Sequence, residues 1–411
     1  MSSPVSPRLD KAGESPVRDG AADRLALFAF FLCGISMSFL GAILPAWRYH
    51  LESNFTQVGD YFLSLALGFL LSAGAAHPLV SRRGAQFVLV LANALACGGF
   101  LLLAFASTPA GAAWRLIGLF WIGVSAGLLS TGTFQILAPS YQRDLAATTN
   151  LAGVLFGSGC LLTALLVSGT YYVYTVPSIL ILLALVPGFS AGVYAQSKLP
   201  RAAEPSSFGF SQVWRDFKNP GAVLFSLLLF FQFGNEWSIA GWLPLFLIRR
   251  LGISPEVSLL ILALYWTALL VGRLISQWII PRIRRGTLLA GSILSALLGT
   301  IVLASTNNRF GAVMGVLFVG AGYAPIYPLV VQKIGHRFPE YRPGVFNGLF
   351  SLAMMGGLLA PWTLGFFASQ WGIQAVMILP MSGACMVFVL TLLILLESRL
   401  SSLSELKGSG F

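Results

Sequence analysis

Glu236 is the residue best placed to do chemistry, because it stands inside the apolar stretch LLFFQFGNEWSIAGWLPLFL at 228–247. A charged acid at the middle of a bilayer costs roughly 2.5–3.5 kcal/mol on insertion scales. Desolvation favours the neutral acid, so a carboxyl there can take up and release a proton near physiological pH. Ionisable residues within membrane spans usually serve a function, and we therefore predict that Glu236 is a proton-coupling site.

Polar and aromatic residues accompany Glu236 on the same predicted helix. Gln232 precedes it by four residues and shares its face, whereas Trp237 lies about 100° away. Such a mixture suits a small polar ligand that also has an apolar face. The predicted substrate-binding residues are Gln232, Asn235, Trp237, Trp242, Tyr323, Tyr327 and Gln135.

Three members of this set carry alternative interpretations. Tyr323 and Tyr327 share a face beside Pro325 and Pro328, which free backbone carbonyls and kink a helix, as a gate or a simple packing bend would need. Gln135 lies toward a helix end, so it also fits a bridge between helices.

Arg273 offers an alternative explanation for Glu236, because the two residues could form a structural ion pair. It lies nearer the cytoplasmic side, and helix rise predicts a depth gap of about 9 Å between the two positions, so a direct pair needs long side chains or a water. Polar residues toward helix ends commonly bridge helices. The residues assigned to gating or helix bridging are Arg273, Asn150, Asn347 and Gln332.

The composition indicates an integral membrane protein. The chain is 56% hydrophobic and 9% charged, whereas soluble domains carry about 25% charged residues. Its basic residues form short runs between apolar segments rather than one patch, which argues against a nucleic-acid partner. Neither a phosphate-binding loop nor an H-E-x-x-H motif is present, so we predict that the protein is not an enzyme and has no cofactor or metal site. The predicted coupling ion is a proton, with sodium as the alternative.

Twelve segments are long enough to cross a bilayer, which takes roughly 20 apolar residues each. They lie near 25–46, 57–80, 85–107, 114–139, 147–168, 176–196, 221–248, 256–280, 287–306, 310–333, 343–368 and 374–396. The predicted organisation is a disordered cytoplasmic N-terminus, a six-helix bundle, a cytoplasmic linker, a second six-helix bundle and a cytoplasmic tail, at 1–23, 24–197, 198–219, 220–397 and 398–411.

The basic residues predict the orientation. If both termini are cytoplasmic, nineteen of the 25 Lys and Arg fall in inside segments, five fall outside, and Arg273 remains within a helix. An excess of positive charge on the cytoplasmic side is the rule for multi-pass proteins. We therefore expect a protein of the plasma or inner membrane with both ends in the cytoplasm.

The two halves resemble each other. GVSAGLLSTGTFQ at 123–135 aligns with GAGYAPIYPLVVQ at 320–332, and the same shift of 197 residues places Asn150 opposite Asn347. Parallel repeats of six helices related by an axis along the membrane normal are an architecture of secondary transporters.

With these features, almost the whole chain resembles the transporters of the major facilitator superfamily. The superfamily's loop signature, G-x-x-x-D-[RK]-x-G-[RK]-[RK], survives in altered form as GAAHPLVSRRG at 74–84, with Pro78 in place of the aspartate. In the second half, GRLISQWIIPRIRRG at 272–286 keeps the basic cluster without the acid. The gating salt bridge that the family builds on that aspartate is therefore in doubt.

Within the superfamily, GAILPAW, RDLAATTN, APIYPL and MMGGLLAPWTLGF are most similar to the fucose permease and related sugar:proton symporters. Where that group carries a coupling aspartate in its first helix, this chain has Gly41, and its fourth-helix glutamate falls near Ser130. Coupling through Glu236 would therefore differ from the pattern of the group.

The resulting hypothesis is an all-α secondary transporter with twelve transmembrane helices in two pseudo-symmetric bundles. It would move a small polar solute, with a sugar as one candidate, by proton-coupled symport through Glu236. It would work as a monomer in the lipid bilayer. The alternatives are an exporter of amphipathic drugs or lipids, and a substrate sensor that keeps the fold without transporting.

Overall fold

The computed structural model describes residues 20–51, 54–106, 112–143, 145–197, 199, 219–337 and 347–408. The backbone alone is described at 20–22, 106, 138–143, 145–146, 347–351 and 400–408. Most of the predicted N-terminal segment and of the predicted linker lies outside the described residues.

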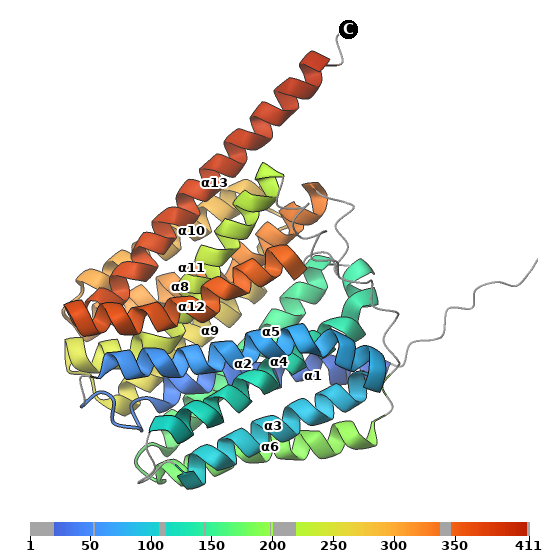
Figure 1. Ribbon diagram of the computed structural model, residues 1–411. Helices are drawn as coiled ribbons and strands as arrows, with labels where there is room; N and C mark the ends of the chain where they lie inside the picture. The colour runs from blue at the N-terminus through green and yellow to red at the C-terminus, as the bar shows by residue number, and fades with distance from the viewer. Residues whose placement is uncertain are drawn as a thin grey trace, which may run out of the picture.

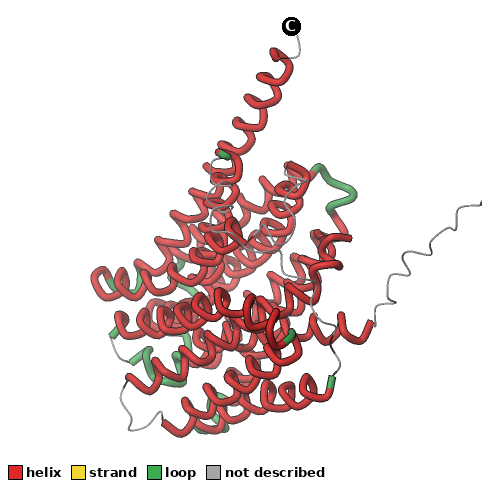
Figure 2. The backbone as a smooth tube through the Cα atoms, turned by 45° about the vertical axis from the view of Figure 1, so that its right-hand side comes forward, coloured by secondary structure: helices red, strands yellow, loops and turns green. Residues whose placement is uncertain are grey.

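The described part of the chain contains twelve helices and no strand (Figures 1 and 2). All twelve are long and apolar enough to cross a membrane. They are α1 (Gly20–Ile43), α2 (Phe55–Arg83), α3 (Ala85–Ala106), α4 (Ala112–Arg143), α5 (Leu145–Thr170), α6 (Val176–Gln196), α8 (Pro220–Leu251), α9 (Pro255–Ile279), α10 (Arg285–Ser305), α11 (Arg309–Arg337), α12 (Asn347–Trp371) and α13 (Ala375–Gly408). The predicted twelve-helix, all-α membrane fold is confirmed.

The helix ends differ from the predicted ones where polar residues continue a helix. α4 runs on to Arg143 and α13 to Gly408, so the segment predicted as a tail begins as helical backbone. Figure 1 shows α13 projecting beyond the other helices toward the C-terminus. No proline or glycine interrupts 398–407, and a helix can therefore continue there without apolar residues on every face.

α8, which carries Glu236, has well-defined ends. The Asn219 side chain accepts a hydrogen bond from the Gly221 amide at 3.0 Å, and Pro220 occupies the first helical position. Gly252 closes the helix in the left-handed conformation, with φ of 63°. These ends fix Glu236 near the midpoint, about 22 Å along the axis from Leu251 at 1.5 Å per residue.

The two halves of the fold meet through several helix pairs. α1 to α6 and α8 to α13 form separate groups in Figure 1. A Cβ on Gly41 of α1 would lie 2.4 Å from the Ala240 carbonyl oxygen of α8, and one on Gly365 of α12 would lie 2.6 Å from the Gly59 Cα of α2. Because both contacts lie toward the end where α1 stops and α2 starts, the halves are in backbone contact at that end.

Within the second half, α12 packs closely on α8 beside the site. A Cβ on Gly356 of α12 would lie 2.0 Å from the Phe230 carbonyl oxygen of α8, and one on Gly357 would lie 2.6 Å from the Trp237 ring. Small residues at such positions allow two helix backbones to approach in a membrane. The placement of Glu236 on α8 therefore depends on these glycines.

Replacing Gly356 with alanine is expected to destabilise the protein by about 1–3 kcal/mol, because the added methyl group must push α12 away from α8. Gly291→Ala is the matched control, since nothing lies within 4 Å of a Cβ at that position in α10. Thermal unfolding of the purified proteins in detergent measures the difference. Equal melting temperatures for the two variants would contradict the proposed close packing.

Candidate functional site

The candidate site is centred on an ion pair between α8 and α9. Glu236 Oε1 and Arg273 Nη2 are 3.7 Å apart, and each side chain is 7% exposed. Charge-assisted hydrogen bonds span about 2.7–2.9 Å. The two groups therefore attract each other through charge without the short contact that would lock them together.

Sequence reasoning placed these two residues at different depths, yet the structure brings their charged ends together. α8 and α9 are neighbouring helices, and the long arginine side chain closes the gap left by the backbone. Tyr265 of α9 also joins the two helices, because its hydroxyl donates a hydrogen bond to the backbone carbonyl oxygen of Glu236 at 3.3 Å.

Arg273 also reaches the first half of the molecule. A Cβ on Gly153 of α5 would lie 2.0 Å from Arg273 Nη1, so the guanidinium rests directly on the α5 backbone. Nearby, Asn150 Nδ2 of α5 donates a hydrogen bond to Gln277 Oε1 of α9 at 2.9 Å. The ion pair thus adjoins the contact between the two halves.

Several buried polar atoms around the pair have no hydrogen-bond partner of normal geometry within the described part of the chain. They are Glu236 Oε2, Arg273 Nε, Gln232 Nε2 and Oε1, Trp266 Nε1 and the Tyr323 hydroxyl. Buried polar groups are normally satisfied, and a group of exceptions calls for an explanation such as a ligand or water. This cluster can therefore offer donors and acceptors to a polar solute.

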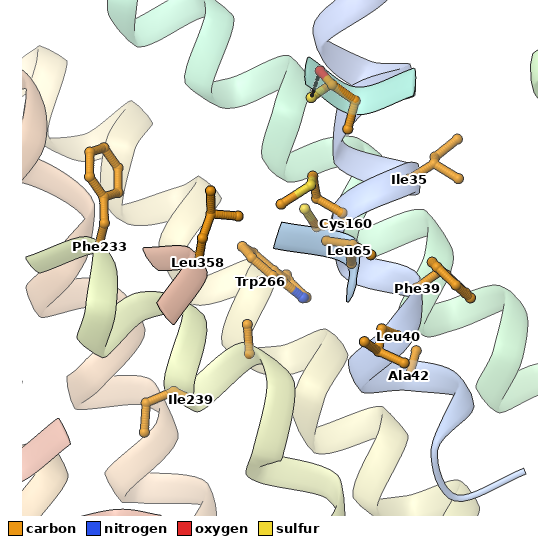
Figure 3. Packing of buried hydrophobic residues seen from close by; sticks show 14 of the residues in the cluster. Ile35, Phe39, Leu40, Ala42, Leu65, Cys160, Phe233, Ile239, Trp266 and Leu358 are labelled. Carbon is orange, nitrogen blue, oxygen red and sulfur yellow. Dashed lines mark hydrogen bonds between the residues drawn. The ribbon is translucent and has the colours of Figure 1, made fainter. Parts of the chain in front are cut away.

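Aromatic rings complete the site. The ring centroid of Trp237 lies 5.8 Å from that of Phe156 on α5 and 6.1 Å from that of Trp266 on α9. Figure 3 shows Trp266 between the helices of the second half and the labelled residues of the first half, with its ring nitrogen turned toward Leu40 and Ala42. Flat apolar surfaces are therefore available beside the polar atoms from both halves.

Three predicted substrate-binding residues make their contacts elsewhere. Trp242 is fully buried, donates from Nε1 to the Pro361 carbonyl oxygen at 2.9 Å and stacks on Phe62. The Asn235 amide lies against α13, where a Cβ on Gly383 would be 1.9 Å from Oδ1. Gln135 Nε2 lies 2.8 Å from His77 Nδ1, joining α4 to α2.

The remaining predicted residues flank the site or fall outside the described side chains. Tyr327 packs its ring 5.2 Å from that of Phe233, one helical turn from Tyr323 on α11. Gln332 is half-buried near the end of α11. Asn347 begins α12, but only its backbone is among the described atoms.

Sequence reasoning missed three contributors, namely Tyr265, Trp266 and the role of Gly153. Trp266 precedes Arg273 by seven residues, or two helical turns, and this spacing could have placed the two on one face. Gly153 lies where a Cβ would meet a guanidinium rather than a helix backbone, and nothing in its sequence context signals that role. No three His, Cys, Asp or Glu side chains in the described ranges come together as a metal site.

Several relatives in sequence are named as transporters. An uncharacterised MFS-type transporter of Yersinia pestis is 24% identical over 364 residues, covering 87% of this chain and 92% of that protein. The glucose/mannose transporter GlcP of Bacillus subtilis is 21% identical over 262 residues, covering 61% of this chain and 65% of that protein.

Solved structures with the same fold are also transporters. The Escherichia coli fucose:proton symporter FucP superposes with a TM-score of 0.62 at 17% identity, covering 91% of this chain and 98% of that chain. The nucleoside transporter NupG superposes with a TM-score of 0.65 at 13% identity, covering 90% and 99%. Residues 26–357 match the sequence model of the Major Facilitator Superfamily. The chain therefore belongs to the Major Facilitator Superfamily and is a multi-pass membrane transporter rather than an enzyme.

Proposed function

We propose that this chain is a proton-coupled symporter of a small polar solute, and that Glu236 is its proton site. The observation that carries the proposal is the loose pair in the core, 3.7 Å long, in which Glu236 Oε2 has no hydrogen bond of normal geometry and, among the described side chains, only that of Gln232 interacts with the carboxylate besides Arg273. A carboxylate held in this way can bind a proton and lose its charge attraction to Arg273, because no short hydrogen bond has to break first.

Sugars and sugar-like hydroxylated molecules are the first candidates for the solute. The Gln232 amide and the Tyr323 hydroxyl can bond to hydroxyl groups, and the rings of Trp237 and Trp266 can pack against a C–H face. Several relatives are named as glucose, mannose or galactose transporters, which supports this class.

Alternating access supplies the transport step. The backbone contacts of Gly41 with Ala240 and of Gly365 with Gly59 join the two halves at the end where α1 stops. The distribution of basic residues supports an orientation in which this end faces the outside and both termini face the cytoplasm. Proton and solute would act by favouring one of two arrangements of the halves, in proportion to their differential affinity. The chain would work as a monomer without a cofactor.

The test is uptake into vesicles that contain the purified protein. With an inwardly directed proton gradient, we expect radiolabelled galactose, glucose, fucose or a related hydroxylated solute to accumulate above its external concentration. A sodium gradient alone should give no accumulation. Uptake that only equilibrates, or that follows sodium alone, would contradict proton symport, and binding without flux would indicate a sensor.

A further inference from the structure

The charges in the membrane core restrict what the solute can be. Among the described side chains, Glu236 and Arg273 are the only buried charged groups. The core is therefore neutral when the carboxyl is ionised and carries one positive charge when the carboxyl holds a proton. An arginine guanidinium does not lose its own proton in a protein.

None of the surrounding titratable groups can restore neutrality. Those within electrostatic reach of the pair are Tyr265 on α9, Tyr323 and Tyr327 on α11, and Cys160 on α5. Phenols and thiols are neutral at ordinary pH. When a proton binds Glu236, Arg273 is left as a buried cation with no counter-charge from these neighbours, and such a state is strongly unfavourable.

The guanidinium itself is arranged to accept another anion. Its Nε is buried without a partner, its contact with Glu236 is loose, and it lies against Gly153 where the two halves meet. A guanidinium binds a carboxylate through two parallel hydrogen bonds, a geometry that the 3.7 Å contact does not reach. A carboxylate on the solute could therefore replace that of Glu236.

We infer that the transported solute is a hydroxylated monocarboxylate, such as a sugar acid, whose carboxylate binds Arg273 while a proton binds Glu236. The inference rests on the proposed function and narrows its substrate class. Each binding event favours the other, because proton and anion together keep the core neutral. One proton and one carboxylate then cross per cycle, and the step moves no net charge.

The test compares matched solutes that differ only in charge. Galacturonate, galactose and the methyl ester of galacturonate share one ring, as do glucuronate, glucose and the ester of glucuronate. Binding to the purified protein is measured at about pH 6 and pH 8, within the range where a buried carboxyl can titrate. We expect at least one acid to bind about tenfold more tightly than its neutral partners. Its affinity should rise at the lower pH.

Vesicle uptake separates this inference from the proposed function. Proton-driven uptake of the acid should be unaffected by an imposed membrane potential. If instead a neutral sugar accumulates with protons, and a membrane potential changes its uptake, the symport proposal stands and the carboxylate inference fails. If no acid binds in a pH-dependent way, the inference also fails. If no solute accumulates, both proposals fail.

A variant tests the role of Arg273 directly. Arg273→Lys keeps the charge but loses the planar fork, so the affinity for the acid should fall about tenfold or more, and by a larger factor than the affinity for the neutral partner. Arg250→Lys is the control, because that arginine bonds to Asn307 away from the site. Equal loss for acid and neutral solute would assign Arg273 a structural role only.

Discussion

Replacing Glu236 with glutamine is expected to abolish uphill accumulation of the solute while exchange of solute across the membrane survives. Glutamine has the shape of the protonated acid but cannot release a proton, so a proton gradient no longer performs work on the solute. The accumulation ratio should fall to about one, and the exchange rate should lose its pH dependence. Counterflow and gradient-driven uptake in vesicles measure the two activities separately.

Asp60→Asn is the control for this substitution. It removes one carboxylate from an exposed position on α2, a helix that carries neither of the two buried charges in the described chain. It should leave accumulation unchanged. Normal accumulation by Glu236→Gln would refute the coupling role, and loss of exchange as well as accumulation would mean that the carboxylate is needed for solute binding or for folding.

The fold was predictable because its signals are local and repeated. Lipid requires about 20 apolar residues per span, and the alternation of basic residues between the predicted loops checks the count independently. Helix ends were less predictable, as α13 shows, because polar residues can prolong a helix beyond the bilayer without an apolar signal.

The site was predictable only in part. Glu236 was evident because an acid in an apolar segment is rare, and Gln232 follows from its position on the same face. Periodicity gives the direction of a side chain but not the helix that it meets. Trp242 and Asn235 lie within six residues of Glu236, yet they contact residues of α2, α12 and α13.

Charge pairing between Glu236 and Arg273 was an alternative that helix rise alone could not decide. The depth argument required long side chains or a water for a direct pair, and the arginine side chain, which spans several ångströms, reaches along its helix to within 3.7 Å of the carboxylate. Gly153 shows the same limit from the other half, since only the fold brings α5 to α9. The chemistry of the core thus depends on contacts between segments that are far apart in sequence.

Removing Arg273 alone is expected to lower stability far more than removing the whole pair. In Arg273→Gln, the Glu236 carboxylate is left buried without a counter-charge, and breaking a buried pair in this way costs about 3–5 kcal/mol. The double variant Glu236→Gln with Arg273→Gln leaves two neutral amides that can hydrogen-bond to each other. It should therefore recover most of the loss, and thermal unfolding of the single and double variants measures the coupling.

The pH dependence of Arg273→Gln gives an independent check on the same pair. Without the Arg273 cation, the buried Glu236 carboxylate has no counter-charge, and binding a proton removes the cost of burying that charge. The free energy of unfolding of the variant should therefore rise as the pH falls from about 8 to about 6. Glu236→Gln with Arg273→Gln should lack this dependence, and Arg309→Gln, at an exposed position that begins α11, should behave like the unmodified protein. The contradicting outcome is that the stability losses of the two single variants add in the double variant. The charges at 3.7 Å would then not interact. Proton binding at Glu236 could in that case affect neither Arg273 nor the contact between the two halves.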